Sequence, residues 1–477
     1  MPRGSDSERH APRTLAILML AALAYALAQT MIVPALPEIQ RDVHATPQDA
    51  TWLLTAFLLT SSVCTPLLGR LGDMYGKERL LLVALSVFGA GSLVAALGHS
   101  LAVLVAGRAV QGAGGAIFPL AIGIVRDEFP RDRVASGIGS ISAMFGIGGG
   151  AGLVLAGVLV DGPGYAWIFW LSLLACAVAA VATWRWVPES PVRVPARVDG
   201  GGAALLSLAL LALLLGVSEG NAWGWLSGRV LGLFAASLVV AWVWVWWELH
   251  VEDPLVDIAL MRRRAVWTTN LATLAVGFAM FGSYILIPQL AQTPASTGYG
   301  FGASVIGSGV FLLPSAFVML LAGPLSGRLG SAYGSKVPMA IGGVAAAASY
   351  LWLAGAHGAR IDIYLAGALL GLGIGFALAA GGNLIVEAVP AEATGVASAV
   401  NAIMRSIGGA IGAQIAAAIV SAKLIAGGFP AESGYTDAFA MSAGAALVAL
   451  AVTALIPGVR ARARAAQAVG AALEGPA

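Results

Sequence analysis

The chain has 477 residues, of which 59% are hydrophobic and only 10% are charged, and its formal net charge is +2. An average soluble domain carries roughly 25% charged residues, so this composition excludes a water-soluble globular protein and indicates that lipid is the working solvent. The small net charge argues against nucleic-acid binding. Cys64 and Cys176 stand alone in apolar segments, which argues against a disulfide framework or a metal site.

Fourteen apolar segments are long enough to cross about 30 Å of hydrocarbon as helices. They cover residues 15–33, 50–68, 80–97, 101–125, 134–160, 167–187, 200–218, 230–247, 266–290, 303–325, 337–356, 361–389, 395–422 and 438–456. The first is too long for the apolar part of a cleavable signal peptide, so we expect it to remain as a span. The sequence therefore predicts an all-α integral membrane protein with fourteen transmembrane helices.

The basic residues give an orientation. With an even number of spans and the N-terminus inside, twenty of the 26 Lys and Arg residues fall in cytoplasmic segments, as the positive-inside rule requires. Arg108 and Arg405 lie within spans, and the outside segments hold only Arg41, Arg229, Arg360 and Lys423. We therefore expect a multi-pass protein of the inner or plasma membrane with both termini in the cytoplasm.

The segments after the second and tenth spans repeat one pattern. Residues 69–79 read GRLGDMYGKER, and residues 327–336 read GRLGSAYGSK. Two six-span halves with a substrate site between them are typical of secondary transporters. We expect a six-helix bundle at 1–187, a linker with two extra transmembrane helices at 188–264, a second six-helix bundle at 265–457, and a cytoplasmic tail at 458–477.

The first copy of the repeat resembles motif A of the major facilitator superfamily. Residues 30–37 and 52–58 are similar to the end of its helix one and the start of its helix two, residues 108–112 (RAVQG) to motif B, and residues 148–157 to motif C on helix five. Fourteen spans resemble its drug/proton antiporter branch, which inserts two helices between the halves. The resemblance implies two pseudo-symmetric bundles that export drugs or antibiotics by proton antiport with alternating access.

Three departures from the family pattern bear on mechanism. The usual proline of motif C is Leu153, so a bend in helix five would rest on glycines; the predicted hinge residues are Gly148, Gly152 and Gly157. Ala28 stands where many relatives carry an acid near the end of helix one, which removes the most obvious proton carrier. Ser331 replaces the aspartate in the second copy of motif A.

Motif A implies a gate on the cytoplasmic side. Asp73 would pin the two halves together while the site faces outward, although a solvated loop carboxylate is the simpler interpretation. We expect the glycines to form a tight turn and the basic residues to reach carboxylates. The predicted gating residues are Gly69, Gly72, Asp73, Gly76, Lys77 and Arg79.

Proton coupling has no obvious carrier, because no Asp, Glu or His lies in the middle of a span. A guanidinium within the bilayer costs about 3 kcal/mol or more without a partner, so Arg108 is a candidate for coupling; the alternative is an arginine that extends to the outer interface. The candidate carboxylates are Asp161, Glu219, which lies just beyond the seventh span, and Glu387. A solvated helix-end charge is the simpler interpretation of each, and we expect the inserted pair, with Glu219, at the edge of the core.

Aromatic and polar residues within the spans could line a substrate cavity, although such residues more often serve helix packing. Asn401 and Arg405 are one helical turn apart and share a face, which suggests a cavity or interhelical role. The predicted cavity residues are Tyr25, Gln29, Trp52, Phe57, Gln111, Asn270, Phe281, Tyr284, Gln289, Phe311, Asn401 and Arg405.

The sequence thus favours a secondary active exporter of hydrophobic or cationic drug-like compounds that works by proton antiport. The alternative is a metabolite or lipid exporter or facilitator without strict proton coupling, which Ala28 makes credible. An enzyme is disfavoured because no catalytic pairing is present. We expect no cofactor, no metal and no nucleic acid; the partners would be an amphipathic or cationic small molecule and membrane lipids, and the protein would act as a monomer.

Overall fold

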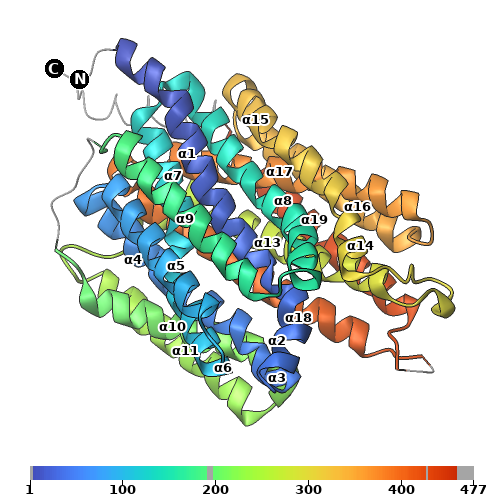
Figure 1. The fold of residues 1–477 in the computed structure, drawn as a ribbon. Coiled ribbons are helices and arrows are strands. Elements are labelled where there is room, and N and C mark those ends of the chain that lie inside the picture. Colours follow the sequence, from blue (N-terminus) through green and yellow to red (C-terminus); the bar gives the residue numbers. More distant parts are fainter. Residues whose placement is uncertain (1–3, 191–196, 426–427, 459–477) are drawn as a thin grey trace, which may run out of the picture.

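The computed structural model describes residues 4–190, 197–425 and 428–458, which are almost entirely helical (Figure 1). The helices are α1 (Gly4–Thr30), α2 (Ile32–Asp42), α3 (Pro47–Ala50), α4 (Trp52–Tyr75), α5 (Lys77–Ala96), α6 (Leu101–Gly112), η1 (Ala113–Ala116), α7 (Ile117–Glu128), α8 (Arg131–Asp161), α9 (Ala166–Trp186), α10 (Gly200–Trp223), α11 (Gly228–Glu248), α12 (Ile258–Met261), α13 (Arg264–Gln292), η2 (Ala295–Thr297), α14 (Val305–Val310), α15 (Leu313–Tyr333), α16 (Lys336–Gly355), α17 (Arg360–Ala388), η3 (Ala391–Ala393), α18 (Thr394–Ser421) and α19 (Glu432–Leu455).

Fourteen helical stretches of the described chain are long and apolar enough to cross a membrane. They match the predicted spans in number and order, which confirms the predicted fold class. The fourth is built from α6, η1 and α7, and the tenth from α14 and α15. The seventh, α10, extends to Trp223, five residues past the predicted end.

The two repeated segments are helical rather than loops. α4 and α15 run through them and stop at Gly76 and Gly334, whose φ angles are +111° and +87°. This backbone region suits glycine because a Cβ atom is strained there. The predicted tight turn is therefore made by Gly76 alone; the expectation that Gly69 and Gly72 belong to it is wrong, because both lie inside α4.

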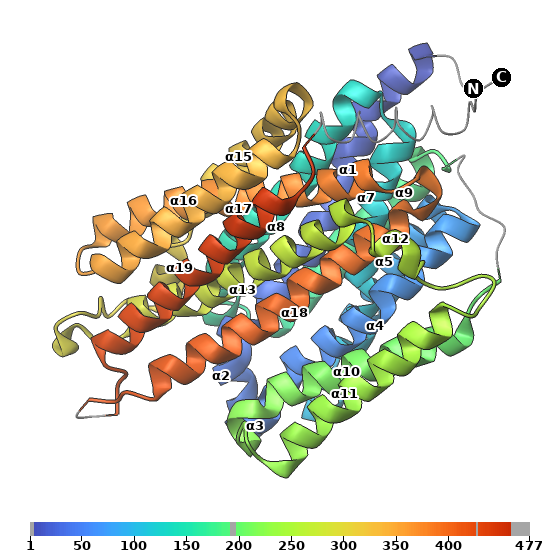
Figure 2. The same cartoon turned by 180° about the vertical axis from the view of Figure 1, so that it is seen from behind.

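The helices form two halves, α1–α9 and α13–α19, that meet along a seam. Across the seam α8 packs on α14, α15 and α17, and α18 packs on α4 and α7. α1 begins and α19 ends at the same end of the bundle (Figure 2), which we call the termini face. The side of the seam formed by α4 and α18 is the side that the inserted helices cover (Figure 2).

The two inserted helices differ in their packing. Only 11% of the most apolar stretch of α11 is buried, against 44% for α10. On α10, Ser218 shares a 2.7 Å hydrogen bond with Thr55 of α4, and Asn221 donates through Nδ2 to Oε1 of Gln414 on α18 at 2.7 Å. The expectation of an edge position thus holds for α11 but not for α10, which bridges the two halves.

The predicted hinge glycines of α8 lie at close helix contacts. A Cβ on Gly148 would lie 2.5 Å from Cβ of Ala26, and one on Gly152 would lie 2.2 Å from Oγ1 of Thr30, both on α1. Gly157 faces α14 in the same way. α8 is one continuous helix, so these glycines permit close packing, and their role as a hinge stays a prediction.

Candidate functional site

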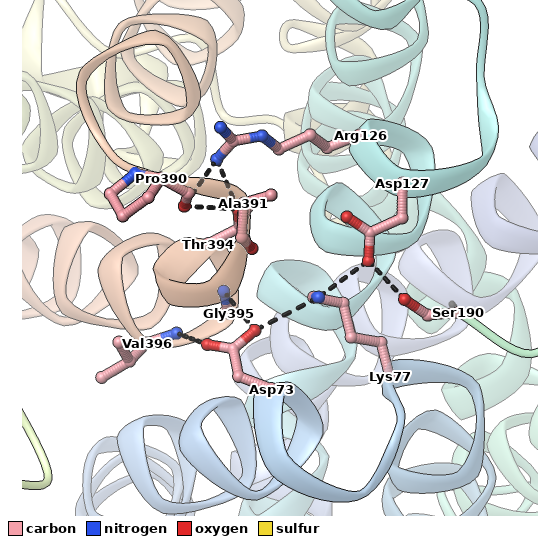
Figure 3. Close-up of polar contacts among 10 residues, drawn as sticks. All are labelled: Asp73, Lys77, Arg126, Asp127, Ser190, Pro390, Ala391, Thr394, Gly395 and Val396. Carbon is pink, nitrogen blue, oxygen red and sulfur yellow. Dashed lines mark hydrogen bonds and ion pairs between the residues drawn. The ribbon is translucent and has the colours of Figure 1, made fainter. Parts of the chain in front are cut away.

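Asp73 joins the two halves near the termini face. The side chain is 1% exposed, and its Oδ1 and Oδ2 accept hydrogen bonds of 3.0 Å from the backbone N–H groups of Gly395 and Val396 (Figure 3). The first turn of a helix has N–H groups without intrahelical partners, and Ala393 at the N-cap of α18 has no side-chain oxygen to accept them. Asp73 therefore caps α18 from the opposite half.

Lys77 supports this contact from within the first half. Its Nζ lies 3.3 Å from Oδ1 of Asp73 and 2.7 Å from Oδ2 of Asp127, which also accepts from Oγ of Ser190 at 2.5 Å (Figure 3). A fully buried ammonium needs such partners. Lys77 reaches two carboxylates, as predicted, and both belong to its own half. The sequence analysis missed Asp127, because a charge at the end of a span looks like a solvated residue.

Arg126 makes a second contact across the seam. Its Nη1 donates to the carbonyl oxygen of Pro390 at 3.1 Å and to Oγ1 of Thr394 at 2.5 Å, and its Nη2 donates to the carbonyl oxygen of Val389 at 2.8 Å (Figure 3 shows the first two). From the sequence, Arg126 contributes only to the distribution of basic residues that predicts the orientation of the chain. Its three bonds satisfy groups around the start of α18, so Arg126 and Asp73 both bridge the seam near the termini face.

The remaining predicted gating residues have different neighbours. Gly69 lies where α4 crosses α18, and a Cβ there would lie 2.9 Å from the carbonyl oxygen of Gly395. Gly72 packs in the same way against a leucine of α7. Arg79 pairs with Glu189, its Nε lying 2.5 Å from Oε1, at an exposed position within the first half. Of this set, Asp73 and Gly69 contact the second half.

A cavity of about 610 Å³ lies between the halves, lined by residues of α1, α2, α4, α6, α8, α10, α13 and α18. Val33 and Thr51, at the ends of helices away from the termini, belong to its wall, so the cavity reaches toward the face opposite the termini. Six of the residues predicted for the cavity or for coupling line it: Gln29, Phe57, Arg108, Glu219, Phe281 and Tyr284.

The other predicted cavity residues lie outside its wall: Tyr25, Trp52, Gln111, Asn270, Gln289, Phe311, Asn401 and Arg405. Several of them join helices instead. Tyr25 stacks on Phe57 with ring centroids 5.8 Å apart, and Nδ2 of Asn401 donates to Oδ1 of Asn270 at 2.9 Å. Phe311 stacks on Tyr364. For these residues helix packing is the better interpretation of the sequence pattern.

Arg108 is buried in the wall of the cavity, at 1% exposure. Its Nε donates to the carbonyl oxygen of Leu53 at 3.0 Å, and its Nη1 donates to that of Ala28 at 3.3 Å and to Oε1 of Gln111 at 2.8 Å. The guanidinium carbon lies 4.1 Å from the ring centroid of Phe57, a cation–π distance. The side chain therefore does not extend to the outer interface, and its charge is held by neutral groups.

Arg405 carries a second buried positive charge, next to the cavity. Its guanidinium carbon lies 4.5 Å from the ring centroid of Phe145 and 5.2 Å from that of Phe118, both in the first half. The nitrogen Nε is buried without a hydrogen-bond partner in the structure described. The residue thus crosses the seam through aromatic contacts rather than pairing with Asn401.

The three candidate carboxylates have different surroundings. Asp161, at the end of α8, is exposed. Glu387, near the end of α17, is also exposed and accepts a hydrogen bond from Ser335. Glu219 is 5% exposed and lines the cavity. Because α10 extends to Trp223, the expectation that Glu219 lies beyond its span is wrong, and this residue alone of the three contacts the cavity.

Comparison with known proteins gives the family. The model of the Major Facilitator Superfamily matches residues 18–413 and again residues 272–474. The chain is 29% identical over 416 residues, 86% of this chain and 76% of the relative, to the tetracenomycin C resistance and export protein of Streptomyces glaucescens. It is 30% identical over 395 residues, 82% of this chain and 72% of the relative, to the multidrug resistance protein Stp of Mycobacterium tuberculosis.

The fold has a solved counterpart. The human organic anion transporter MFSD10 (TETRAN) matches with a TM-score of 0.68 over 93% of this chain and 99% of that chain, at 16% sequence identity. This match shows the shared fold, whereas the family follows from the match over most of the sequence. The chain is thus a multi-pass plasma-membrane protein that belongs to the Major Facilitator Superfamily and is similar to its multidrug efflux transporters.

Proposed function

We propose that this protein exports amphipathic organic compounds across the membrane by alternating access, in exchange for protons. The observation that supports this most is the combination of a cavity of about 610 Å³ between the halves with a polar seal on one side of it. A transporter with such a seal is closed at one face and must break the contacts of Asp73 and Arg126 to open there. Resistance and export proteins among the relatives support the same direction of transport.

The orientation follows from charge. The short segments at the termini face carry most of the basic residues, and such segments stay in the cytoplasm. We therefore place the termini and the seal inside the cell, and the open end of the cavity outside. In this orientation the structure is the state that releases substrate to the exterior.

Proton coupling would use groups other than the missing acid of the first span. At that position Ala28 offers only its carbonyl oxygen, which accepts from Arg108. Arg108 and Glu219 are the charged residues of the described cavity wall, and they are the groups through which protonation could alter substrate binding. The absence of a carboxylate at Ala28 also favours a second candidate, an exporter without strict proton coupling.

Transport in proteoliposomes separates these two candidates. For molecules whose termini face the bath, an acidic lumen should drive uptake of a fluorescent substrate, and a protonophore should abolish that uptake. Arg108→Gln should reduce gradient-driven uptake more than Arg108→Lys, because lysine keeps the charge near Phe57 and Gln111. Uptake that does not depend on the pH gradient would favour the uncoupled exporter. If no compound in a panel of cationic and neutral dyes is taken up, export itself is contradicted.

A further inference from the structure

Glu219 is the one acidic residue in the described wall of the cavity. It comes from α10, a helix that belongs to neither six-helix half and that is expected, from its place in the sequence, to lie outside the core. The residues that line the cavity beside it on α10 include the apolar Leu214 and Val217 and the polar Ser218 and Asn221. A carboxylate removed from bulk water is costly unless a partner compensates for lost hydration.

The structure described gives Glu219 no such partner. As a whole residue Glu219 is 5% exposed, and no hydrogen bond or ion pair joins its carboxylate to a described residue. The other buried glutamate of the inserted pair, Glu248, is a useful contrast. It accepts from Nε1 of Trp244 at 2.8 Å and from the backbone N–H of Val256 at 3.3 Å. Glu248 therefore has a structural role, whereas the contacts of Glu219 leave it free to bind a ligand.

Two hydrogen bonds hold Glu219 in place at the seam. Ser218, immediately before it, is bonded to Thr55, and Asn221, two residues after it, is bonded to Gln414. Both bonds join α10 to helices that line the cavity. The position of the carboxylate is thus set by both halves at once, which is the arrangement expected of a binding residue rather than of a loose surface charge.

The other charge in the wall does not neutralise Glu219. The donors Nε and Nη1 of Arg108 are bonded to Leu53, Ala28 and Gln111, and its guanidinium is covered by the ring of Phe57. The rest of the cavity wall includes the aromatic side chains of Phe57, Phe281 and Tyr284. A flat aromatic body with a positive group fits this combination, because aromatic faces attract cations and the carboxylate provides the counter-charge.

We propose that Glu219 binds a positively charged group of the transported compound, so that the inserted helix α10 forms part of the substrate site. This inference rests on the proposed export function and adds to it a class of substrate, aromatic organic cations, and the residue that selects that class. It also gives the inserted pair a role in recognition, beyond filling space beside the seam.

Two fluorescent probes test the proposal, ethidium as a permanent aromatic cation and Nile red as a neutral aromatic dye. Binding is measured to the purified full chain in lipid nanodiscs. We expect Glu219→Gln to weaken ethidium binding about tenfold or more and to change Nile red binding by less than about twofold, because the substitution removes charge but little volume. Glu219→Asp should retain most of the ethidium affinity, and Asp161→Asn, which removes an exposed carboxylate outside the cavity, should change neither.

Thermal unfolding of each variant shows whether it is folded, and the aspartate variant keeps the test valid if the glutamine variant is unstable. Equal losses for both dyes, unchanged ethidium affinity in Glu219→Gln, or an equally large selective loss in Asp161→Asn would overturn the proposal. A wild-type protein that transports Nile red but neither binds nor transports ethidium would overturn this inference while leaving export intact. Failure to transport any dye would instead refute the proposed function.

Discussion

Asp73 links a local helix-capping interaction to the arrangement of the whole molecule. Its carboxylate replaces the cap that Ala393 cannot provide, and its partners belong to the other half. A side-chain N-cap is worth about 1 kcal/mol, and a negative charge at a helix N-terminus adds up to about 2 kcal/mol when partly buried. Losing 1 to 2 kcal/mol changes a two-state ratio by roughly 5- to 30-fold, which is enough to shift the balance between sealed and open states.

Asp73→Asn should therefore impair turnover more than substrate binding. The amide keeps one acceptor oxygen but turns an NH₂ group toward a backbone N–H, and it leaves Lys77 with less negative charge. We expect the maximal transport rate to fall about tenfold while equilibrium affinity for the substrate changes by less than about twofold. Transport rate and binding are measured on the same preparation.

Ser331→Ala is the matched control, because Ser331 holds the equivalent place in the second copy of the repeat. Its hydroxyl donates to the carbonyl oxygen of Gly327 in its own helix, so its loss should leave turnover unchanged. A large loss of affinity in Asp73→Asn with an unchanged rate would show that the residue is not a gate.

The sequence indicated the surroundings of some candidate residues and not of others, for a physical reason. Asp73 and Arg108 lie in segments that resemble family motifs, and both are buried in contacts between helices. Tyr25 and Tyr284 look alike in sequence, yet only Tyr284 lines the cavity, whereas Tyr25 is bonded to Ser61 and packed on Phe57. Which face of an apolar helix meets a cavity depends on neighbours that periodicity does not reveal.

At the scale of helices, α10 connects the two halves beside the cavity. Its contact with α18 includes a buried apolar cluster, formed by Leu210, Leu214, Ile403 and Ile407. The same contact includes two hydrogen bonds from Asn221 to Gln414. Its contact with α4 includes one polar bond, between Ser218 and Thr55, and the half-buried Leu59, which packs against the same cluster. When the halves rearrange, α10 should therefore stay with α18 and separate from α4.

Disulfide cross-links test which half carries α10. In a background without the native cysteines, oxidation of the Asn221→Cys and Gln414→Cys pair should leave transport close to that of the same variant in its reduced form, because those helices move together. Ser218→Cys paired with Thr55→Cys should inhibit transport reversibly, with recovery after reduction. The opposite pattern would assign α10 to the first half, and inhibition by both cross-links would show that α10 moves independently of both.

Lengths of apolar segments were enough to predict the order of the helices, but not where each ends. The fourteen spans follow from the need to cross the bilayer as hydrogen-bonded helices. α4 ends at Tyr75, before Gly76 with its positive φ angle, whereas the sequence suggested an end seven residues earlier, at Leu68. α10 continues past Ser218 because Ser218, Glu219 and Asn221 lie at the seam and the cavity. In a single sequence such polar residues suggest that a helix has ended. In the folded chain they lie within the helix and face other helices or the cavity.

At the scale of the molecule, the termini face and the opposite face differ. The contacts of Asp73, Lys77 and Arg126 close the termini face, and the cavity lies beyond them, toward the opposite face. Alternating access requires that these contacts break when the opposite face closes. The distribution of basic residues supports the proposal that this face is cytoplasmic, and the proposed orientation predicts from which side a reagent reaches the cavity.

The most direct measurement is labelling by a small membrane-impermeant thiol reagent, 2-(trimethylammonium)ethyl methanethiosulfonate, applied to intact cells. Ser406→Cys places a thiol in the cavity wall, and Tyr333→Cys places one at an exposed position on the termini face. We predict that Ser406→Cys is modified from outside, that Tyr333→Cys is modified only after permeabilisation, and that adding Asp73→Asn slows modification of Ser406→Cys as the sealed state loses population. Modification of Tyr333→Cys from outside, or of Ser406→Cys only from inside, would contradict the account.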